Sequence, residues 1–419
     1  MMYKQSGVEW LGEIPSGWST WKVSRLFKKI GSGTTPTAGT PEYYADGIIP
    51  WINTGDLNDS YISVCSSYIT QKAFDDHSSL KTYEAGTLII AMYGATIGKI
   101  AITKFEACTN QACCSLVHPK LIDTKFAFYW FIANKENIIN LSYGGGQPNI
   151  SQDIVRSLKI PICDIPEQQS IVHFLDYKTG QIDSFIANRQ KQIELLKEQK
   201  AGIINKAVTK GINPDAKMKP SGIEWIGEIP EGWEVVKLKY AAKLQSGETI
   251  TADDITEIGD YPVFGGNGLR GYADSYTNEG NFILIGRQGA LCGNINYATG
   301  KFWASEHAVV AYLRKPINIL WFGELLRAMN LNQYSQAAAQ PGLSVDRIKN
   351  LFLPFPNYQE QNVIELYIKS ETTTINTLIS KYQKQIDLMQ EYRTSLISQA
   401  VTGKIDVREW QPNKKEKIL

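Results

Sequence analysis

Three short stretches of this 419-residue chain approach patterns that carry chemistry, and each fails on one requirement. Gly94–Lys99 approaches a phosphate-binding loop, but a Walker motif would need Gly in place of Tyr93 and Ser or Thr in place of Ile100. Phe264–Gly268 fits the F-x-G-x-G pattern that holds S-adenosylmethionine, but the flanking residues predict a turn where that site needs a strand and a helix. Glu198-Gln199-Lys200 resembles part of a nuclease motif, but it lies on a predicted helix, where a solvated face is expected.

Residue types that bind metals or attack substrates are scattered along the chain. The four histidines have no partner at metal-ligand spacing, and the six cysteines, including the adjacent pair Cys113-Cys114, show no C-x-x-C spacing. The amine-methylating motifs N-P-P-Y and D-P-P-Y do not occur. We therefore expect no catalytic site, no disulfide framework and no metal site in this chain.

A helical segment that occurs twice organises the sequence. The copies run from Pro166 to Pro214 and from Gln359 to Val407, at a constant offset of 193 (360 − 167 for the leading Glu-Gln pair). Apolar residues recur every 3.5 positions on average, which is typical of a coiled-coil seam. Because the two seams have equal length, we expect them to pair with each other. The predicted pairing residues are Leu175, Ile182, Ile186, Ile193, Leu196 and Ile203 in the first copy, and Ile368, Ile375, Ile379, Ile386, Met389 and Leu396 in the second.

Polar residues interrupt both seams at matching positions. They are Arg189 and Lys200 in the first copy, and Tyr382 and Arg393 in the second. Two interpretations remain open: these residues fix the register of the pair, or their side chains merely extend to solvent. In either case about 42 helical residues with a rise of 1.5 Å predict a rod of roughly 60 Å, which would act as a spacer.

Composition bounds the rest of the chain. With 43% apolar residues, the chain can bury two ordinary cores as well as the rod. We expect no membrane span and no signal peptide, and the cysteine usage favours a reducing cytoplasm. A net charge of +1 argues neither for nor against nucleic acid, because a DNA-binding protein with this balance would gather its basic residues on one face.

Two globular blocks precede the two helical segments, and each begins with the same motif. Ser6 to Trp18 returns as Ser221 to Trp233, at an offset of 215. Its tryptophans, glycine turns and proline predict a docked loop rather than a helix or strand, with a structural role. In the first block, Ile48–Ile52 and Thr87–Ala91 are predicted strands and Thr124 to Asn140 is a predicted helix.

The second block repeats the plan of the first at lower identity. Asn110-Gln111-Ala112 matches Glu306-His307-Ala308 in position, and the loop Gln147–Ser151 matches Gln340–Ser344. The scaffold is duplicated while the polar loop residues differ, as expected for a protein that reads two different targets. The predicted domains are an N-terminal repeat segment (1–21), a first globular domain (22–163), a central coiled-coil helix (164–213), a linker repeating the N-terminal segment (214–236), a second globular domain (237–356), a C-terminal coiled-coil helix (357–408) and a polar basic tail (409–419).

These features together resemble the DNA specificity subunit of type I restriction–modification systems. The resemblance rests on two diverged blocks, each starting with GEIP-x-GW and each followed by an E-Q-led helix that ends in A-V-T, and it covers essentially the whole chain. It implies an α+β fold with two similar mixed α/β target-recognition domains, related by a pseudo-twofold internal repeat and separated by two long helices in an antiparallel coiled coil.

The resemblance also implies a function and partners. Each domain would read one half of a bipartite target in double-stranded DNA, with an unread gap between the halves, and the subunit would have no catalytic activity. It would recruit two modification subunits, which methylate adenine, and two restriction subunits, which translocate and cleave DNA. S-adenosylmethionine, ATP and magnesium are expected on those partner subunits and no cofactor is expected on this chain.

Residues suited to DNA contact occur on the diverged loops. Arginine reads guanine, and asparagine or glutamine reads adenine, in the major groove; phosphate contacts position the protein without specifying sequence. Gln147 and Gln340 are weaker candidates, because a residue common to both blocks is poorly suited to reading different sequences. The candidate contacts are Thr34, Thr35, Tyr93, Lys99, Asn110, Gln111 and Asn149 in the first block, and Asn267, Arg270, Arg287, Gln288 and His307 in the second.

Two other functions compete with this interpretation. One is a coiled-coil assembly or adaptor protein whose globular domains bind protein rather than DNA. The other is a methyltransferase or nuclease in its own right, against which the missing motifs argue. Salt-dependent DNA binding that requires a modification subunit, or is strengthened by one, would separate DNA recognition from the adaptor function.

Overall fold

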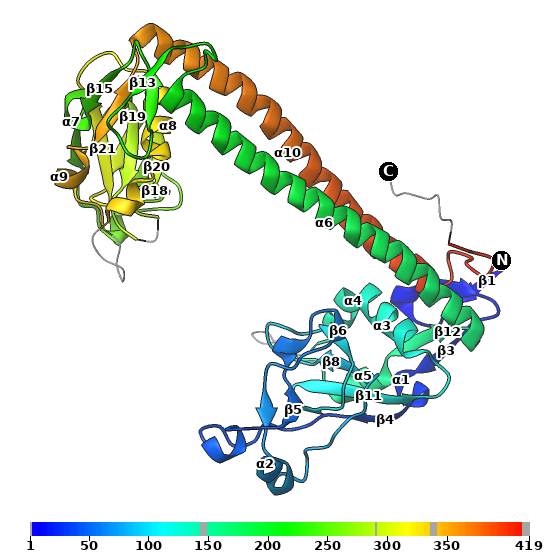
Figure 1. Ribbon diagram of the computed structural model, residues 1–419. Helices are drawn as coiled ribbons and strands as arrows, with labels where there is room; N and C mark the ends of the chain where they lie inside the picture. The colour runs from blue at the N-terminus through cyan, green and yellow to red at the C-terminus, as the bar shows by residue number, and fades with distance from the viewer. Residues whose placement is uncertain (1, 143–148, 290, 336–341, 413–419) are drawn as a thin grey trace. The chain divides into compact units, whose positions relative to one another are not determined.

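A computed structural model describes residues 2–142, 149–289, 291–335 and 342–412 of the chain (Figure 1). The chain forms two compact units: unit 1 comprises 1–189 with 384–419, and unit 2 comprises 190–383. Each unit contains one mixed α/β block and part of each long helix, α6 (Ile165–Lys210) and α10 (Tyr358–Val401). Within the described ranges, none of the helices has the length and apolar character that crossing a membrane requires.

Unit 1 is built on a five-stranded sheet of order β4-β11-β8-β9-β6. Its neighbours are antiparallel except for the β6–β9 pair, which is parallel, and a second sheet has the order β10-β5-β7. The two strands predicted in this block are confirmed as β5 and β8. The strands are β4 (Phe27–Gly31), β5 (Ile49–Ile52), β6 (Ser60–Ile62), β7 (Tyr68–Ile69), β8 (Leu88–Ala91), β9 (Ile100–Thr103), β10 (Cys108–Thr109) and β11 (Cys113–Pro119).

The helix predicted over Thr124 to Asn140 is divided in the structure. It forms α3 (Thr124–Ala133) and α4 (Lys135–Ile139), which meet at Asn134. The backbone of Asn134 leaves the helical region (φ −111°, ψ 15°), and its side-chain amide donates to the carbonyl of Trp130 at 2.8 Å. An asparagine side chain that bonds to nearby backbone competes with the helix, which explains the break. The other helices of this block are α1 (Val23–Leu26), α2 (Gln71–Asp76) and α5 (Gln152–Ser157).

Unit 2 repeats this plan with a six-stranded sheet of order β16-β21-β19-β20-β17-β18. Its first four strands correspond to β4-β11-β8-β9, and β17 again adds in parallel, to β20. The long strand β20 covers the positions that β9 and β10 occupy separately in unit 1. The elements are β16 (Ala242–Ser246), β17 (Tyr261–Gly265), β18 (Gly268–Ala273), β19 (Asn278–Gly286), β20 (Ile295–Ala304), β21 (Ala308–Leu313), α7 (Leu238–Ala241), α8 (Ile319–Ala328) and α9 (Val345–Ile348).

The repeated motif before each block is docked, as expected, but it is not purely loop. In unit 1 it forms a 3-10 turn (Glu9–Leu11) and the strand β2 (Glu13–Pro15), which pairs with β1 (Tyr3–Gln5). In unit 2, β14 (Glu228–Pro230) pairs with β13 (Met218–Pro220) in the same way. A second pair of short strands closes each block: β3 (Ser19–Lys22) with β12 (Lys159–Ile162), and β15 (Glu234–Lys237) with β22 (Phe352–Phe355).

The buried tryptophan of this motif contacts the helix that follows the block. The indole of Trp18 donates to Glu167 on α6 at 3.4 Å, and the indole of Trp233 donates to Glu360 on α10 at 2.8 Å. Both tryptophans are almost fully buried. The G-W and E-Q ends of the sequence repeat are therefore joined by the same hydrogen bond in both units, and this bond anchors each block to its helix.

Helices α6 and α10 run antiparallel, which confirms the predicted pair. In unit 1, Arg393 of α10 donates to Asp183 of α6 at 3.0 Å. In unit 2, Lys200 of α6 donates to Asn376 of α10 at 2.9 Å. The residue numbers sum to 576 in both contacts (393 + 183 and 200 + 376), as an antiparallel pair with one register requires. The seam cations Lys200 and Arg393 therefore reach the opposite helix and link the pair.

Most of the predicted seam residues are buried where the two helices pack. Leu175, Ile182, Ile193 and their counterparts Ile368, Ile375 and Ile386 are at most 5% exposed. Leu396 is buried as well, whereas Ile186, Leu196, Ile203, Ile379 and Met389 are partly exposed. An apolar seam continues through the part of the helix pair that belongs to each unit.

Both long helices end earlier than we expected. α6 ends at Lys210 rather than 213, and α10 ends at Val401 rather than 408. Gly211 (φ +74°) follows the first end and Gly403 (φ +71°) lies two residues beyond the second. Glycine adopts the left-handed conformation that terminates a helix at little cost, so these residues set the ends.

Candidate nucleic-acid interface

In unit 1, three loops meet at one end of the main sheet. They follow β4, connect β8 to β9, and precede β11, and these strands are antiparallel neighbours. Gly33 allows the first and third loops to approach closely, because a Cβ there would lie 1.7 Å from the carbonyl oxygen of Thr109. The N–H of Gly33 also donates to the carbonyl of Asn110 at 3.3 Å. The fold therefore gathers polar residues from distant parts of the sequence.

Most candidate residues of unit 1 lie in this group of loops. The hydroxyl of Thr35 donates to the side-chain oxygen of Gln111 at 2.6 Å, and both residues are exposed. Burial raises the pKa of Tyr93, and a hydrogen bond with Gln111 acts weakly in the opposite direction. The backbone of Tyr93 also forms a β-bridge with Asn149. An exposed amide, a hydroxyl and a phenol are therefore presented together.

Asn110 has a different position from its neighbour Gln111. Its amide nitrogen donates to Asn53 at 3.2 Å, and its side-chain oxygen accepts from the N–H of Ala112 at 3.1 Å. Because both ends of this side chain are engaged, Asn110 holds the loop in place. Asn53 is a member of the group that the sequence analysis missed. The signal was its position directly after the predicted strand Ile48–Ile52.

The other two candidates of unit 1 lie at the margins of the group. The carbonyl of Thr34 accepts from the indole of Trp51 at 3.1 Å, so its backbone position is fixed. Lys99 closes the turn between β8 and β9, where its N–H donates to the carbonyl of Thr96 at 2.9 Å. Both residues are partly exposed. Their contact with a phosphate backbone stays a prediction.

Unit 2 gathers its candidates at the equivalent end of its sheet. The N–H of Arg287 donates to the carbonyl of His307 at 2.8 Å, and its guanidinium donates to Ser246 at 3.3 Å. Gly247 approaches β20 as Gly33 approaches β10, since a Cβ there would lie 2.1 Å from the carbonyl oxygen of Ala304. Gln288 is exposed and forms a β-bridge with Gly342. The same close approach thus builds both groups of loops.

The turn between β17 and β18 adds the remaining candidates. Asn267 is exposed and accepts a hydrogen bond from Asn294 at 3.4 Å. The side chain of Arg270 packs over Gly265, where an added Cβ would lie 2.4 Å from its Cδ. Gly266 and Asn267 connect β17 to β18, which pair antiparallel. The F-x-G-x-G stretch is therefore a hairpin turn, and it lacks the strand–helix setting of a cofactor loop.

A carboxylate that the sequence analysis left out lies within the group of unit 2. Glu306 pairs with the imidazole Nε2 of His307 at 3.0 Å. It occupies the position that Asn110 has in unit 1, so the repeat alignment itself was the signal that could have identified it. A carboxylate can accept a hydrogen bond from the amino group of cytosine, whereas an amide at the same position favours adenine. The two units therefore present different hydrogen-bonding groups from one scaffold.

The described residues of these groups hold amides, hydroxyls, a phenol, an imidazole, a carboxylate, an ammonium group and guanidinium groups, all of which can form hydrogen bonds. Gln147 and Gln340, the two weaker candidates, lie outside the described residues, as do residues 413–419 of the predicted tail. The geometry suits recognition of a polar surface by the ends of two similar sheets.

Comparisons with known proteins agree with the duplicated architecture. A model of the type I restriction modification DNA specificity domain matches residues 15–195 and 230–388. The chain is 30% identical over 393 residues to the type I restriction enzyme EcoprrI specificity subunit of Escherichia coli, covering 88% of this chain and 89% of that protein. It is 23% identical over 424 residues to the MjaVIII specificity subunit of Methanocaldococcus jannaschii, covering 94% of each.

Solved structures share the fold at lower sequence identity. One chain, from a study of complex assembly and conformational transition of the type I restriction–modification system, has a TM-score of 0.74 at 14% identity, covering 94% of this chain and 99% of that chain. The HsdS subunit from Thermoanaerobacter tengcongensis has a TM-score of 0.53 at 14% identity, covering 94% and 98%. With a family match to most of the sequence in two copies, this chain is a non-catalytic specificity subunit and belongs to the type I restriction–modification DNA specificity family.

Proposed function

We propose that the chain recognises a bipartite target in double-stranded DNA, with each globular domain reading one half and a gap left unread. The domains would span 22–163 and 237–356. The observation that carries this proposal is the repeat itself. One scaffold presents Asn110 and Gln111 at the end of one sheet, and Glu306 and His307 at the equivalent end of the other. Conserving the scaffold while changing the hydrogen-bonding groups gives two readers with different specificities.

Within each group, different residues would do different work. The side-chain oxygen of Gln111 accepts from Thr35, which orients the amide; its N–H donors, one of which bonds to Tyr93, are the groups that would meet a base. Arg287 and Lys99 would neutralise phosphates or read guanine, while Asn110 and its bond to Asn53 would position the loop. Exposed candidates therefore act as readers, and candidates with both ends engaged act as supports.

The helix pair would set the gap and bind two modification subunits, which would use S-adenosylmethionine to methylate adenine. Two restriction subunits, which use ATP and magnesium, would complete the complex. Support comes from the relatives, which are specificity subunits of type I restriction enzymes. Further support comes from the long helices. The boundaries between the units fall after residue 189 and before residue 384, and α6 and α10 run through them without a break.

A single-residue change in each domain tests this proposal directly. Gln111→Ala should relax the methylated sequence in one half-site and His307→Ala in the other half-site. The loss of one good base contact corresponds to about 1–3 kcal/mol of discrimination. The positions of methylated adenine in DNA from cells carrying each variant and the partner subunits give the result. Gln71→Ala, which truncates an exposed glutamine on α2, is the matched control and should leave both half-sites unchanged.

The same experiment decides against the adaptor function. An adaptor whose globular blocks bind protein would give no dependence of the methylated sequence on Gln111 or His307. Binding of the assembled complex to its target should also weaken steeply as salt rises, because phosphate contacts release counterions. If both half-sites changed together in either variant, the assignment of one half to each domain would be wrong.

A further inference from the structure

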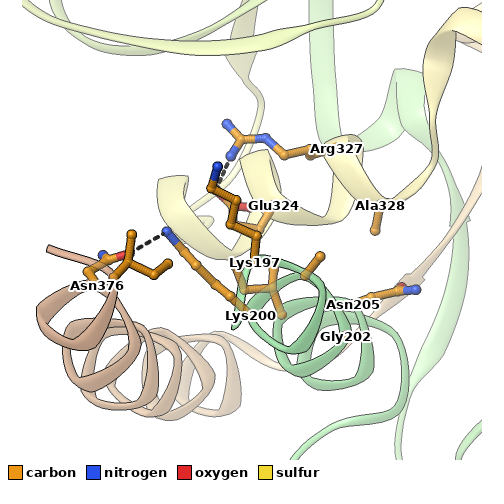
Figure 2. A pocket seen from close by; sticks show the side chains of 11 residues that line it. Lys197, Lys200, Gly202, Asn205, Glu324, Arg327, Ala328 and Asn376 are labelled. Carbon is orange, nitrogen blue, oxygen red and sulfur yellow. Dashed lines mark hydrogen bonds and ion pairs between the residues drawn. The ribbon is translucent and has the colours of Figure 1, made fainter. Parts of the chain in front are cut away.

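Unit 2 contains a half-open pocket of about 640 Å³ where α8 meets the helix pair (Figure 2). This volume falls within the range of sites that bind small ligands or single large side chains. The lining is mainly apolar, and Figure 2 shows the labelled polar residues around it. The apolar lining includes Ala201, Ile204, Ala328 and Ile379.

A buried carboxylate lies in the wall of this pocket. Glu324 is 6% exposed, and its Oε1 accepts from the hydroxyl of Tyr297 at 3.0 Å and pairs with Arg327 at 3.2 Å. Its Oε2 is also buried but has no hydrogen-bond partner among the described residues. Because Oε2 is shielded from solvent, the carboxylate must rotate slightly to meet an occupant. A buried acceptor without a partner costs free energy, so an occupant that brings an N–H or O–H donor favours that rotation.

Unit 1 places an aromatic ring at the corresponding position. With an offset of 195, Glu324 of α8 corresponds to Tyr129 of α3 (Thr124 to Ile319 for the first residues of the helices). The hydroxyl of Tyr129 donates to Asp176 at 2.6 Å and lies 3.4 Å from Thr179. Burial raises the pKa of Tyr129, and the nearby Arg393, the counterpart of Lys200, lowers it. Unit 1 thus fills the site beside its helix pair with a phenol of its own.

The neighbouring isoleucines show the consequence for packing. Ile397 in unit 1 is fully buried, whereas its counterpart Ile204 in unit 2 is partly exposed and lines the pocket. The repeat therefore has a ring with a hydrogen-bond donor in one unit, and in the other unit a pocket with an unpartnered acceptor. An occupant of the pocket would restore the packing that unit 1 already has.

Gly202 lines the pocket on the side of α6. A Cβ at Gly202 would meet nothing within 4 Å, although the residue lines the pocket. A larger side chain at this position would extend into the free space without a clash at its Cβ, which makes Gly202 a suitable position for blocking the site.

The charge at the rim indicates what surrounds the occupant. Lys197 lines the pocket, and its ammonium group has no ion pair or hydrogen bond within the part of the chain that the structure describes. Lys200 and Arg327 add positive charge nearby, although each already has a partner. A free cation beside an apolar pocket favours a ligand whose apolar group is flanked by carboxylates.

We propose that this pocket binds a tyrosine or tryptophan side chain of a partner protein, set in an acidic segment. The ring would pack on Ile204 and Ile379, its O–H or N–H would donate to Glu324, and a flanking carboxylate would pair with Lys197. Tyrosine and tryptophan are the residues that most often anchor protein interfaces in such pockets. The partner is a modification subunit, and to that extent the inference rests on the proposed function. Because Tyr129 holds the position of Glu324 in unit 1, two copies of that partner bind with unequal affinity.

The first test uses a probe that does not depend on any partner. p-Cresol, the side chain of tyrosine, should give saturation-transfer NMR signals with the full chain, and toluene, which lacks the donor, should bind about 10-fold more weakly. Gly202→Leu should abolish the p-cresol signal. Gly180→Leu is the matched control, because Gly180 is an exposed glycine of the same helix whose Cβ would also meet nothing within 4 Å. Equal binding of p-cresol to Gly202→Leu and to the unmodified chain overturns the site.

The second test uses purified modification subunits in calorimetric titrations of the full chain. The unmodified chain and Gly180→Leu should bind two copies with unequal affinity, and Gly202→Leu should lose at least 10-fold on the tighter step. Unchanged binding by Gly202→Leu overturns the inference and leaves the proposed function intact. If the unmodified chain binds no modification subunit, both the partner assignment and the proposed function are wrong.

Discussion

Gln168, the second residue of the E-Q pair on α6, should contribute more to the stability of unit 1 than any exposed residue of that helix. Its side chain is fully buried, its oxygen accepts from the N–H of Asp123 at 2.8 Å, and its nitrogen donates to the carbonyls of Leu121 (3.1 Å) and Cys163 (2.9 Å). Gln168→Ala would leave one N–H and two carbonyls without these partners. At about 1–3 kcal/mol for each buried unsatisfied group, and less for carbonyls that keep a second bond, we expect a loss of about 2–5 kcal/mol.

The next residue along the helix supplies the control. Gln169 is exposed, so Gln169→Ala should change the free energy of unfolding by less than about 0.5 kcal/mol. Because the chain has two units, whole-chain denaturation need not be two-state, and amide hydrogen exchange of α3 residues in urea would report on unit 1 itself. A Gln168→Ala variant whose unfolding free energy matches that of Gln169→Ala would refute the reasoning. Gln361→Ala repeats the test in unit 2, where the buried side chain makes two such bonds, to Asn318 and Pro356.

Three further predictions follow from the helix pair and the buried thiols. Asn376→Asp should give Lys200 an ionic partner and raise the free energy of unfolding by up to about 1 kcal/mol at low salt, seen as a slightly higher midpoint of thermal unfolding, whereas Asn376→Lys should lower both. Adding four residues near Glu198 and four near Glu391 lengthens the helices by about 6 Å, so sequencing of methylated DNA should show a gap longer by roughly one to two base pairs and unchanged half-sites; an active variant with the original gap would show that the helices do not set it. Burial raises the pKa of the Cys108 thiol from 9.0 to about 12, so the folded state keeps a proton that the unfolded state loses, and stability should fall as pH rises from about 9 towards 12. Urea midpoints at pH 8 and pH 10 should show this fall, and it should be smaller in Cys108→Ala.

The repeated features of the fold could be predicted because a duplicated sequence repeats its constraints. The periodic seam residues predicted the antiparallel helices, and short β-type runs predicted β5 and β8. The break at Asn134 could not be predicted from apolar spacing, because it comes from one side chain bonding to the carbonyl of Trp130. The helix ends were misplaced for a similar reason, since Gly211 and Gly403 terminate α6 and α10 while the sequence similarity continues beyond them.

The candidate interface shows the same division. Residue type and divergence between the blocks were enough to select Gln111 and His307, and the structure places each at the end of its sheet. The support given by Asn53 could not be predicted, because its contact with Asn110 joins residues 57 positions apart. From the sequence, Gln168 could be identified only as part of the repeated Glu-Gln pair. Its buried hydrogen bonds could not be predicted, because its three partners lie in two other segments. Sequence repetition identifies equivalent positions, but the contacts that give each position its role are non-local.

The seam cations illustrate how a repeat can specify orientation as well as register. Lys200 and Arg393 are equivalent residues of the two copies, and so are Asp183 and Asn376 (200 + 193 and 183 + 193). If the helices paired in parallel with the repeats aligned, Lys200 would face Arg393, and two like charges 4 Å apart repel by about 1–4 kcal/mol at the effective dielectric constants of water and a protein surface. In the antiparallel pair, Arg393 meets Asp183 and Lys200 meets Asn376 instead. Exposed pairs of this kind each contribute at most about 1 kcal/mol, so most of the preference comes from the repulsion that the antiparallel arrangement avoids. Lys200 and Arg393 therefore affect the two arrangements unequally. They favour the antiparallel pair over the parallel one.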